Sequence, residues 1–273
     1  MPLVTMNEIL PQAKKEGRAI CAFNVANLET LLSVFKAAEE VTDAIIIQVY
    51  QRLFNDERAV MIGEMTKYLA KKSDMKIVLH LDHGVSVEQI QQAVDAGYTS
   101  VMFDGSKLPF EENIKLTSEC VKIARQAGVS IEGEIGHVPF GGGDIEISTT
   151  AEAIEFAERT GVDALALSIG TAHGFYTKEP ELNIERAREI GESISVPMVL
   201  HGGTGVSTEQ VKQVISCGVA KINIATELQH LFMGSIRTEL EKNSDKFIPV
   251  DLYLKPVEEK IIEYVRTKIN SFK

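Results

Sequence analysis

The sequence predicts an α/β fold, a single (β/α)8 TIM barrel covering residues 1–273 as one domain, with an extra helical segment at the C-terminus. Its 273 residues, 44% of them hydrophobic, are enough for one such barrel, which needs roughly 250 residues. Short β-branched runs alternate with amphipathic stretches along the whole chain, which is typical of repeated βα units. No linker or low-complexity stretch interrupts this alternation.

Eight runs are expected to form strands: 19–24, 44–49, 76–81, 100–103, 129–134, 164–168, 197–200 and 219–224. Helical periodicity follows them, for example over 28–41, 87–96, 112–126 and 208–216, and the tail 255–273 is expected to form one more helix. The runs DAIIIQV and KIVLHL are continuously apolar, as buried parallel strands are. The alternative, an open doubly wound sheet, favours a glycine-rich fingerprint after the first strand, and CAFNVANLET has none.

Composition excludes several classes of function. A net charge of −11 argues against nucleic-acid binding, because phosphate backbones are bound by clustered Lys and Arg. No apolar run reaches 18 residues and the first residues carry charges, so we expect a cytoplasmic protein without a membrane segment or signal peptide. Cys21, Cys120 and Cys217 lack CxxC spacing and are expected to be buried apolar residues.

Polar residues are expected at the carboxyl ends of the strands, where barrels of this kind place their catalytic groups. These residues are Asn24, Asp82, His83, Asp104, Glu132, Glu134, His173, His201 and the stretch 223–226. The sequence therefore predicts a functional site at this rim.

Three of the six histidines, His83, His173 and His201, fall on the rim. Three histidines with an open fourth position are typical of a catalytic zinc site. A single histidine is more often hydrogen-bonded or in contact with substrate, but three that converge beside Asp104 and Glu134 favour a metal. The other histidines, His80, His137 and His230, are expected to have structural roles.

Two stretches follow the last two expected strands, HGGTG (201–205) and NIAT (223–226). Loops at these positions form the recurrent phosphate site of the barrel, where backbone N–H groups and a helix N-terminus meet the anion. The glycines alone would also fit a tight turn.

A metal beside a phosphate suits chemistry on a phosphorylated carbonyl compound. Zinc can polarise the carbonyl and stabilise the enediolate that forms when a C–C bond breaks. Asp82, next to a histidine ligand, is placed to transfer the hydroxyl proton as a general acid or base. Alternatively, Asp82 orients a ligand histidine.

The motifs resemble those of the class II, metal-dependent ketose-bisphosphate aldolases, which include fructose- and tagatose-bisphosphate aldolases. They run nearly from end to end: AFNVANLE, HLDHG (80–84), FDGS (103–106), PFEEN (109–113), IEGEIG (131–136), IGTAHG (169–174), EPELN (179–183), LHGGTGV (200–206) and KINIATEL (221–228). HLDHG, GTAHG and LHGGTG in this order are highly specific, and NIATEL is closer to the tagatose branch.

The resemblance implies reversible cleavage of a ketose 1,6-bisphosphate to dihydroxyacetone phosphate and an aldehyde such as glyceraldehyde 3-phosphate. It assigns the catalytic Zn2+ to His83, His173 and His201, proton transfer to Asp82, and a second divalent or a monovalent cation to Asp104 and Glu134. Dihydroxyacetone phosphate would be bound by Asn24, Gly174, Gly202, Gly203, Thr204, Asn223, Ile224, Ala225 and Thr226. The family also implies a homodimer or homotetramer.

Three departures from the family concern proton transfer and the aldehyde half. The loop after IEGEIG reads HVPFGGGD, with Asp144 in place of two acidic residues. Near the C-terminus, Asp251 stands about where the family has an arginine that binds the aldehyde-side phosphate of a neighbouring subunit. Tyr50 and Arg52 follow the second strand, and Arg52 either replaces the missing charge or is a solvated residue at a helix start.

Three other functions remain open. An aldolase of the same family could use a different, non-phosphorylated aldehyde. A metal-independent aldolase would form a Schiff base, for which Lys221 in the eighth strand is the candidate. A non-catalytic sugar-phosphate-binding protein would retain the fold without the reaction.

Overall fold

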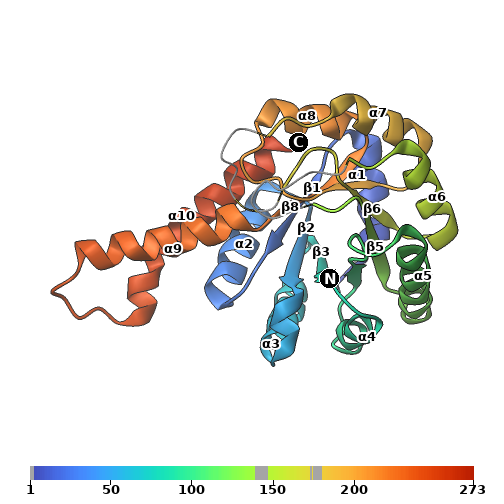
Figure 1. The fold of residues 1–273 in the computed structure, drawn as a ribbon. Helices are drawn as coiled ribbons and strands as arrows, with labels where there is room; N and C mark the ends of the chain where they lie inside the picture. Colours follow the sequence, from blue (N-terminus) through green and yellow to red (C-terminus); the bar gives the residue numbers. More distant parts are fainter. Residues whose placement is uncertain (1–2, 139–146, 173, 175–179) are drawn as a thin grey trace.

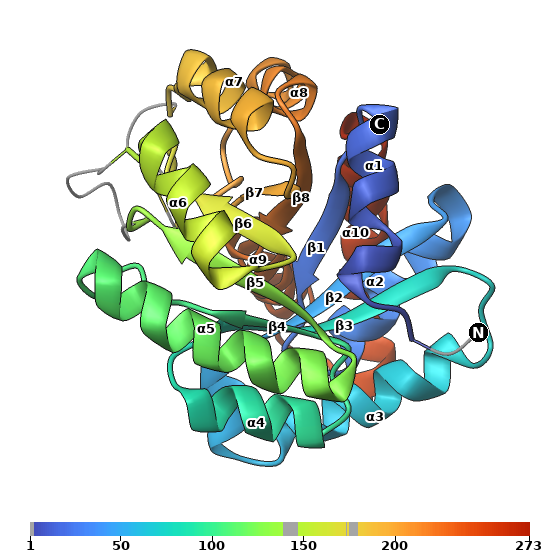
Figure 2. The same ribbon diagram turned by 90° about the vertical axis from the view of Figure 1, so that its right-hand side faces the viewer.

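The computed structural model describes residues 3–138, 147–172, 174 and 180–273. Eight parallel strands pair in sequence order and β8 pairs with β1, so the sheet closes into a barrel surrounded by helices (Figure 2). The strands are β1 (Ile20–Asn24), β2 (Ala44–Tyr50), β3 (Lys76–Gly84), β4 (Ser100–Phe103), β5 (Ser130–Ile135), β6 (Ala164–Leu167), β7 (Met198–Leu200) and β8 (Val219–Ile224). The predicted (β/α)8 barrel is confirmed.

The helices cover the outside of the barrel, apart from those at the N-terminus. They are η1 (Met6–Glu8), α1 (Leu10–Glu16), α2 (Leu28–Val41), η2 (Gln51–Asn55), α3 (Arg58–Ala70), α4 (Val87–Asp95), α5 (Phe110–Ala127), α6 (Thr150–Thr160), α7 (Ile184–Ser193), α8 (Thr208–Ser216), α9 (Thr226–Lys242) and α10 (Val250–Ser271). Side chains of Ser86, Asn183 and Ser207 cap α4, α7 and α8 by accepting a first-turn backbone N–H. These short polar residues explain why the helices begin where they do.

Two expected boundaries differ from the structure by three residues or more, and others differ by one or two residues. The third strand continues to Gly84 instead of ending at residue 81. The C-terminal helix begins at Val250 instead of residue 255, because Pro249 serves as its N-cap and Pro256 lies inside the helix instead of in its first turn.

Apolar side chains fill the amino end of the barrel. Met6 and Leu10, from η1 and α1, are buried there with Ala22, Ile46 and Val78 of the strands. A larger apolar cluster lies between the outer faces of the strands and the surrounding helices. These contacts close the amino end of the barrel.

The helices α9 and α10 extend away from the barrel as a two-helix arm (Figure 1). The C-terminal part of the arm returns to the body of the molecule, where α10 packs against α2 and β1. Several apolar side chains of the arm are exposed: Met233, Leu240, Phe247, Val250 and Leu252. Within the described residues, no helix is both long and apolar enough to span a bilayer.

Candidate active site

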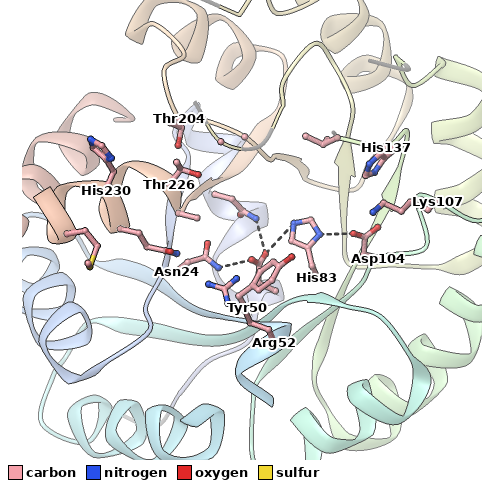
Figure 3. Close-up of a pocket in the computed structure, with 18 residues that line it drawn as sticks. Asn24, Tyr50, Arg52, His83, Asp104, Lys107, His137, Thr204, Thr226 and His230 are labelled. Atoms are coloured by element: carbon pink, nitrogen blue, oxygen red, sulfur yellow. Dashed lines mark hydrogen bonds and ion pairs between the residues drawn. The ribbon is translucent and has the colours of Figure 1, made fainter. Parts of the chain in front are cut away.

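A pocket of about 460 Å³ opens at the carboxyl ends of the strands (Figure 3). It is lined by residues from several elements, among them Asn24 of β1, Asp82 and His83 of β3, Asn223 of β8 and Thr226 of α9. The structure therefore brings together side chains that are far apart in the sequence, at the rim that the sequence predicted.

The end of β3 departs from regular strand geometry. Successive side chains of a strand point to opposite faces, yet Asp82 and His83 both line the pocket. The β3–β4 register shifts between Leu81 and Gly84, and His83 has a φ of 56°. This irregularity turns two adjacent polar side chains toward one pocket, a role that bulges often have beside active sites.

Asp82 is buried and its carboxylate accepts two side-chain hydrogen bonds. Asn24 Nδ2 donates to Oδ2 at 2.7 Å, and Asn223 Nδ2 donates to Oδ1 at 3.3 Å. Burial raises the pKa of the Asp82 carboxyl, but the nearby His83, His201 and Lys221, with the hydrogen bond from Asn24, outweigh it and hold the pKa below its ordinary value. Asp82 is therefore an ionised, oriented carboxylate that faces the pocket.

A second group contains His83, Glu134 and His201, whose ligand atoms all lie within 4.8 Å of one another. Glu134 Oε2 is 3.3 Å from His201 Nδ1 and 3.9 Å from His83 Nδ1. Asp104 Oδ2 is 2.8 Å from His83 Nδ1, and Ser106 donates to Asp104 Oδ1. The predicted ligand His173 lies outside the described residues, so the structure brings together His83 and His201 with the two predicted carboxylates.

The electrostatics of this group favour a cation. Burial lowers the pKa of His83, but Asp82 and Asp104 outweigh it and raise the pKa to about 10. Burial and the nearby Asp104 raise the pKa of Glu134 to about 8. Glu134 Oε2 is buried and, within the described residues, accepts no hydrogen bond. A divalent cation would stabilise both carboxylates, and the imidazole and carboxylate donors fit zinc.

The glycine-containing loops lie beside the carboxylates. Gly174, Gly202 and Thr204 line the pocket together with Ala225 and Thr226, whereas Gly203 and Ile224 are not among its lining residues in the described part of the chain. The helix α9 begins at Thr226, and its N-cap residue Ala225 makes no side-chain capping hydrogen bond. The first N–H groups of a helix have no partner within the helix. Such an arrangement is suited to binding a phosphate.

The loop after β7 is tied to the C-terminal helices through Glu227. Its Oε1 accepts a hydrogen bond from the Gly205 amide at 3.0 Å, and its Oε2 lies 2.7 Å from Lys268 Nζ and also accepts from Tyr264. Burial raises the pKa of Glu227, but Lys268 and Tyr264 lower it below its ordinary value. The loop therefore depends on contacts with α10.

The pocket is also lined by residues for which no site role was expected from the sequence. His137 and His230, expected to be structural, both line it, as does Lys107. Arg52, in η2, lies 4.7 Å from the ring centroid of Tyr50, and the Tyr50 ring centroid lies 5.9 Å from that of His83. Arg52 therefore lies at the rim of the pocket. Lys107 lies in a turn and His230 in a helix, so the alternation of side chains along a β-strand could not predict that they line the pocket.

Two further charged residues, Glu132 and Lys221, are fully buried inside the barrel. Lys221 Nζ lies 2.8 Å from Glu132 Oε2, and neither residue is among the pocket-lining residues of the described chain. The side chain proposed for Schiff-base chemistry is therefore held in an internal ion pair.

Known proteins are similar to this chain in sequence and in fold. The family model described as fructose-bisphosphate aldolase class-II matches residues 4–273. A probable fructose-bisphosphate aldolase of Bacillus subtilis (strain 168) is 40% identical, with 100% of this chain and 98% of that protein covered. A fructose-bisphosphate aldolase of Staphylococcus aureus (strain Mu50) is 38% identical with the same coverage.

Solved structures of aldolases are also similar to this chain in fold. The crystal structure of the YdjI aldolase from Escherichia coli K12 has a TM-score of 0.87 and 36% sequence identity, covering 99% of this chain and 97% of that one. A putative fructose-1,6-bisphosphate aldolase from Coccidioides immitis has a TM-score of 0.85 and 26% identity, covering 96% of this chain and 94% of that one. The family model matches nearly the whole chain, and a relative is 40% identical over all of it. This chain therefore belongs to the class II fructose-bisphosphate aldolase family.

Proposed function

We propose that this protein is a zinc-dependent aldolase that reversibly cleaves a ketose 1,6-bisphosphate, of the fructose or tagatose type, to dihydroxyacetone phosphate and an aldehyde such as glyceraldehyde 3-phosphate. One observation carries the proposal. The ionised Asp82, held by two asparagines, shares a pocket with His83, while Glu134 and His201 lie beside His83. The names of the relatives, fructose-bisphosphate aldolases, agree with it.

In this proposal His83, His173 and His201 hold the zinc ion. Asp104 and Glu134 are available to a second divalent or a monovalent cation. Bound zinc would supply Lewis-acid polarisation of the substrate ketone.

Asp82 carries the proton of the reaction. In a ketose with its carbonyl at C2, the bond between C3 and C4 breaks. The Asp82 carboxylate takes the proton of the C4 hydroxyl, whose oxygen becomes the aldehyde carbonyl. The electron pair of the broken bond passes to the dihydroxyacetone phosphate half as an enediolate. C3 then takes a proton that comes from water, and Asp82 releases the hydroxyl proton to water. The hydrogen bonds from Asn24 and Asn223 keep the Asp82 oxygens oriented for this transfer.

The two ends of the substrate are bound by different parts of the pocket. We assign the dihydroxyacetone phosphate half to the loops after β7 and β8 and to the α9 N-terminus, through Gly202, Gly203, Thr204 and residues 223–226. Gly174 and Asn24 complete this half. Arg52 is assigned to the aldehyde half, because it is a guanidinium at the pocket rim beside Tyr50.

We also propose that residues 1–273 act as one domain of a cytoplasmic homodimer or homotetramer. The exposed apolar side chains of the arm support self-association, because Phe247 at its tip is 93% exposed and Val250 is 72% exposed.

The test is exchange of a C–H hydrogen of dihydroxyacetone phosphate with deuterium from D2O, measured before chelation, after chelation and after zinc is restored. This partial reaction needs no aldehyde. Exchange that stops on chelation and returns with zinc is the expected result. Exchange that survives chelation would contradict zinc dependence, and no exchange by folded, zinc-loaded protein would contradict the aldolase reaction. A screen of phosphorylated and non-phosphorylated aldehydes then identifies the acceptor.

A further inference from the structure

Three fully buried side chains form a connected group below the pocket: Glu132, Lys221 and His201. Glu132 Oε1 lies 2.8 Å from His201 Nε2, and Glu132 Oε2 lies 2.8 Å from Lys221 Nζ. Each oxygen of the carboxylate therefore has its own donor, and the carboxylate is fixed in one orientation inside the barrel.

This arrangement determines which nitrogen of His201 carries hydrogen. A carboxylate paired with an ammonium group only accepts hydrogen bonds, so His201 Nε2 must be the N–H donor. In a neutral imidazole the other nitrogen, Nδ1, then carries no hydrogen and can act as an acceptor or a metal ligand. Nδ1 is also the atom that lies 3.3 Å from Glu134 Oε2, on the side of the candidate cation site.

We propose that Glu132 and Lys221 are positioning residues that hold His201 in its Nε2–H tautomer, so that Nδ1 is presented to the metal. This inference rests on the proposed metal site. Histidine ligands in metal sites commonly donate their second N–H to a carboxylate, and loss of that partner typically weakens metal affinity about 10- to 100-fold. Lys221 acts on His201 indirectly. Its ammonium donates to Glu132 Oε2, the carboxylate oxygen that does not contact His201, and so holds the carboxylate in its orientation.

The first measurement uses the unaltered protein. In zinc-loaded protein labelled with 15N-histidine, long-range coupling between ring nitrogens and ring hydrogens reports which nitrogen carries hydrogen in each imidazole. We expect His201 to carry hydrogen on Nε2 and to bind zinc through Nδ1. The opposite tautomer would overturn the proposal without any variant.

The second measurement is zinc affinity, by competition with a chelator, in the double variant Glu132→Leu with Lys221→Met, which leaves His201 Nε2 without the carboxylate oxygen that accepts its hydrogen. Both charges are removed together, so no buried charge is left without a partner. Ser100→Ala is the matched control, because Ser100 Oγ lies 2.7 Å from His80 Nδ1 inside the same barrel and its loss leaves the Glu132–His201 contact in place.

We expect the double variant to bind zinc about 10- to 100-fold more weakly and the control within about threefold of the unaltered protein. Equal affinity in all three proteins, or equal losses in both variants, would overturn the positioning role. No zinc binding by the unaltered protein would instead contradict the proposed metal site itself. Should the double variant not fold, the tautomer of the unaltered protein decides.

Discussion

Replacing Asp82 by Asn separates proton transfer from the other steps of the proposed reaction. The substitution keeps the size of the side chain and removes its ability to accept a proton. In the structure Asp82 accepts hydrogen bonds at 2.7 Å from Asn24 and at 3.3 Å from Asn223, so the new amide group can replace only one acceptor. Turning its NH2 toward Asn223 loses the longer bond, at a cost of about 1 kcal/mol in unfolding free energy.

The effect on catalysis is expected to be much larger than the effect on stability. General acid–base catalysis contributes about 10²- to 10⁴-fold, or roughly 2.7 to 5.4 kcal/mol of activation free energy at 1.36 kcal/mol per factor of ten. We therefore expect kcat for cleavage to fall by this factor. Because the proton in question belongs to the aldehyde half, exchange of the C–H hydrogen of dihydroxyacetone phosphate should stay within about tenfold.

The assay compares cleavage, exchange and zinc content in Asp82→Asn and in Asp95→Asn. Asp95 is exposed at the end of α4, and its carboxylate accepts a hydrogen bond from the Gln91 side chain. The Asp95→Asn substitution should therefore leave cleavage, exchange and zinc content unaltered. Cleavage and exchange that fall by one common factor in Asp82→Asn would refute transfer of the hydroxyl proton. A cleavage rate within threefold of the unaltered protein would refute any proton-transfer role.

Three other changes test the pocket and the arm. Gly202→Ala should weaken the binding of dihydroxyacetone phosphate about 10- to 100-fold, as measured by titrating the isotope exchange. The reason is that φ at Gly202 is +66° and an added Cβ would lie 2.4 Å from the Ala172 carbonyl oxygen. Unchanged binding would show that this loop does not bind the phosphate. Glu227→Gln should lower unfolding free energy by about 1 to 2 kcal/mol in denaturant titrations at neutral pH. Since the folded pKa of Glu227 is below its ordinary value, that difference is present above about pH 4.5 and should disappear as pH falls through the folded pKa; a difference that persists in acid would contradict the ionic role. Phe247→Glu should shift the protein toward monomer in light scattering after size-exclusion chromatography, and an unchanged mass would place the interface elsewhere.

The fold could be predicted because every βα unit shows its own local pattern. β4, β8, α2 and α8 have the bounds that periodicity gave, since apolar runs and capping residues act within a few positions. The rim followed from the rule that parallel strands share one carboxyl end. Asn24, Asp82 and Asn223 meet there as expected.

The geometry between strands could not be predicted in this way. Regular alternation would place Asp82 and His83 on opposite faces, and only the register shift after Leu81 turns both toward the pocket. Lys107 and His230 reach the pocket from a turn and from α9, whose directions are set by packing. The local pattern of apolar and polar residues therefore could not predict that Lys107 and His230 line the pocket.

Lys221 shows how one such contact decides between two mechanisms. Its parity with Asn223 makes it the strand residue best placed for a Schiff base, and that chemistry needs a neutral amine that can reach the substrate. In the structure its ammonium is fully buried and 2.8 Å from Glu132 Oε2. Within the described residues, Lys221 is not among those that line the pocket. The contact with Glu132 holds the Lys221 side chain away from the pocket, so borohydride in the presence of dihydroxyacetone phosphate should trap no adduct on Lys221. An adduct at that residue would mean that the pair opens during turnover and would favour the imine mechanism over the metal.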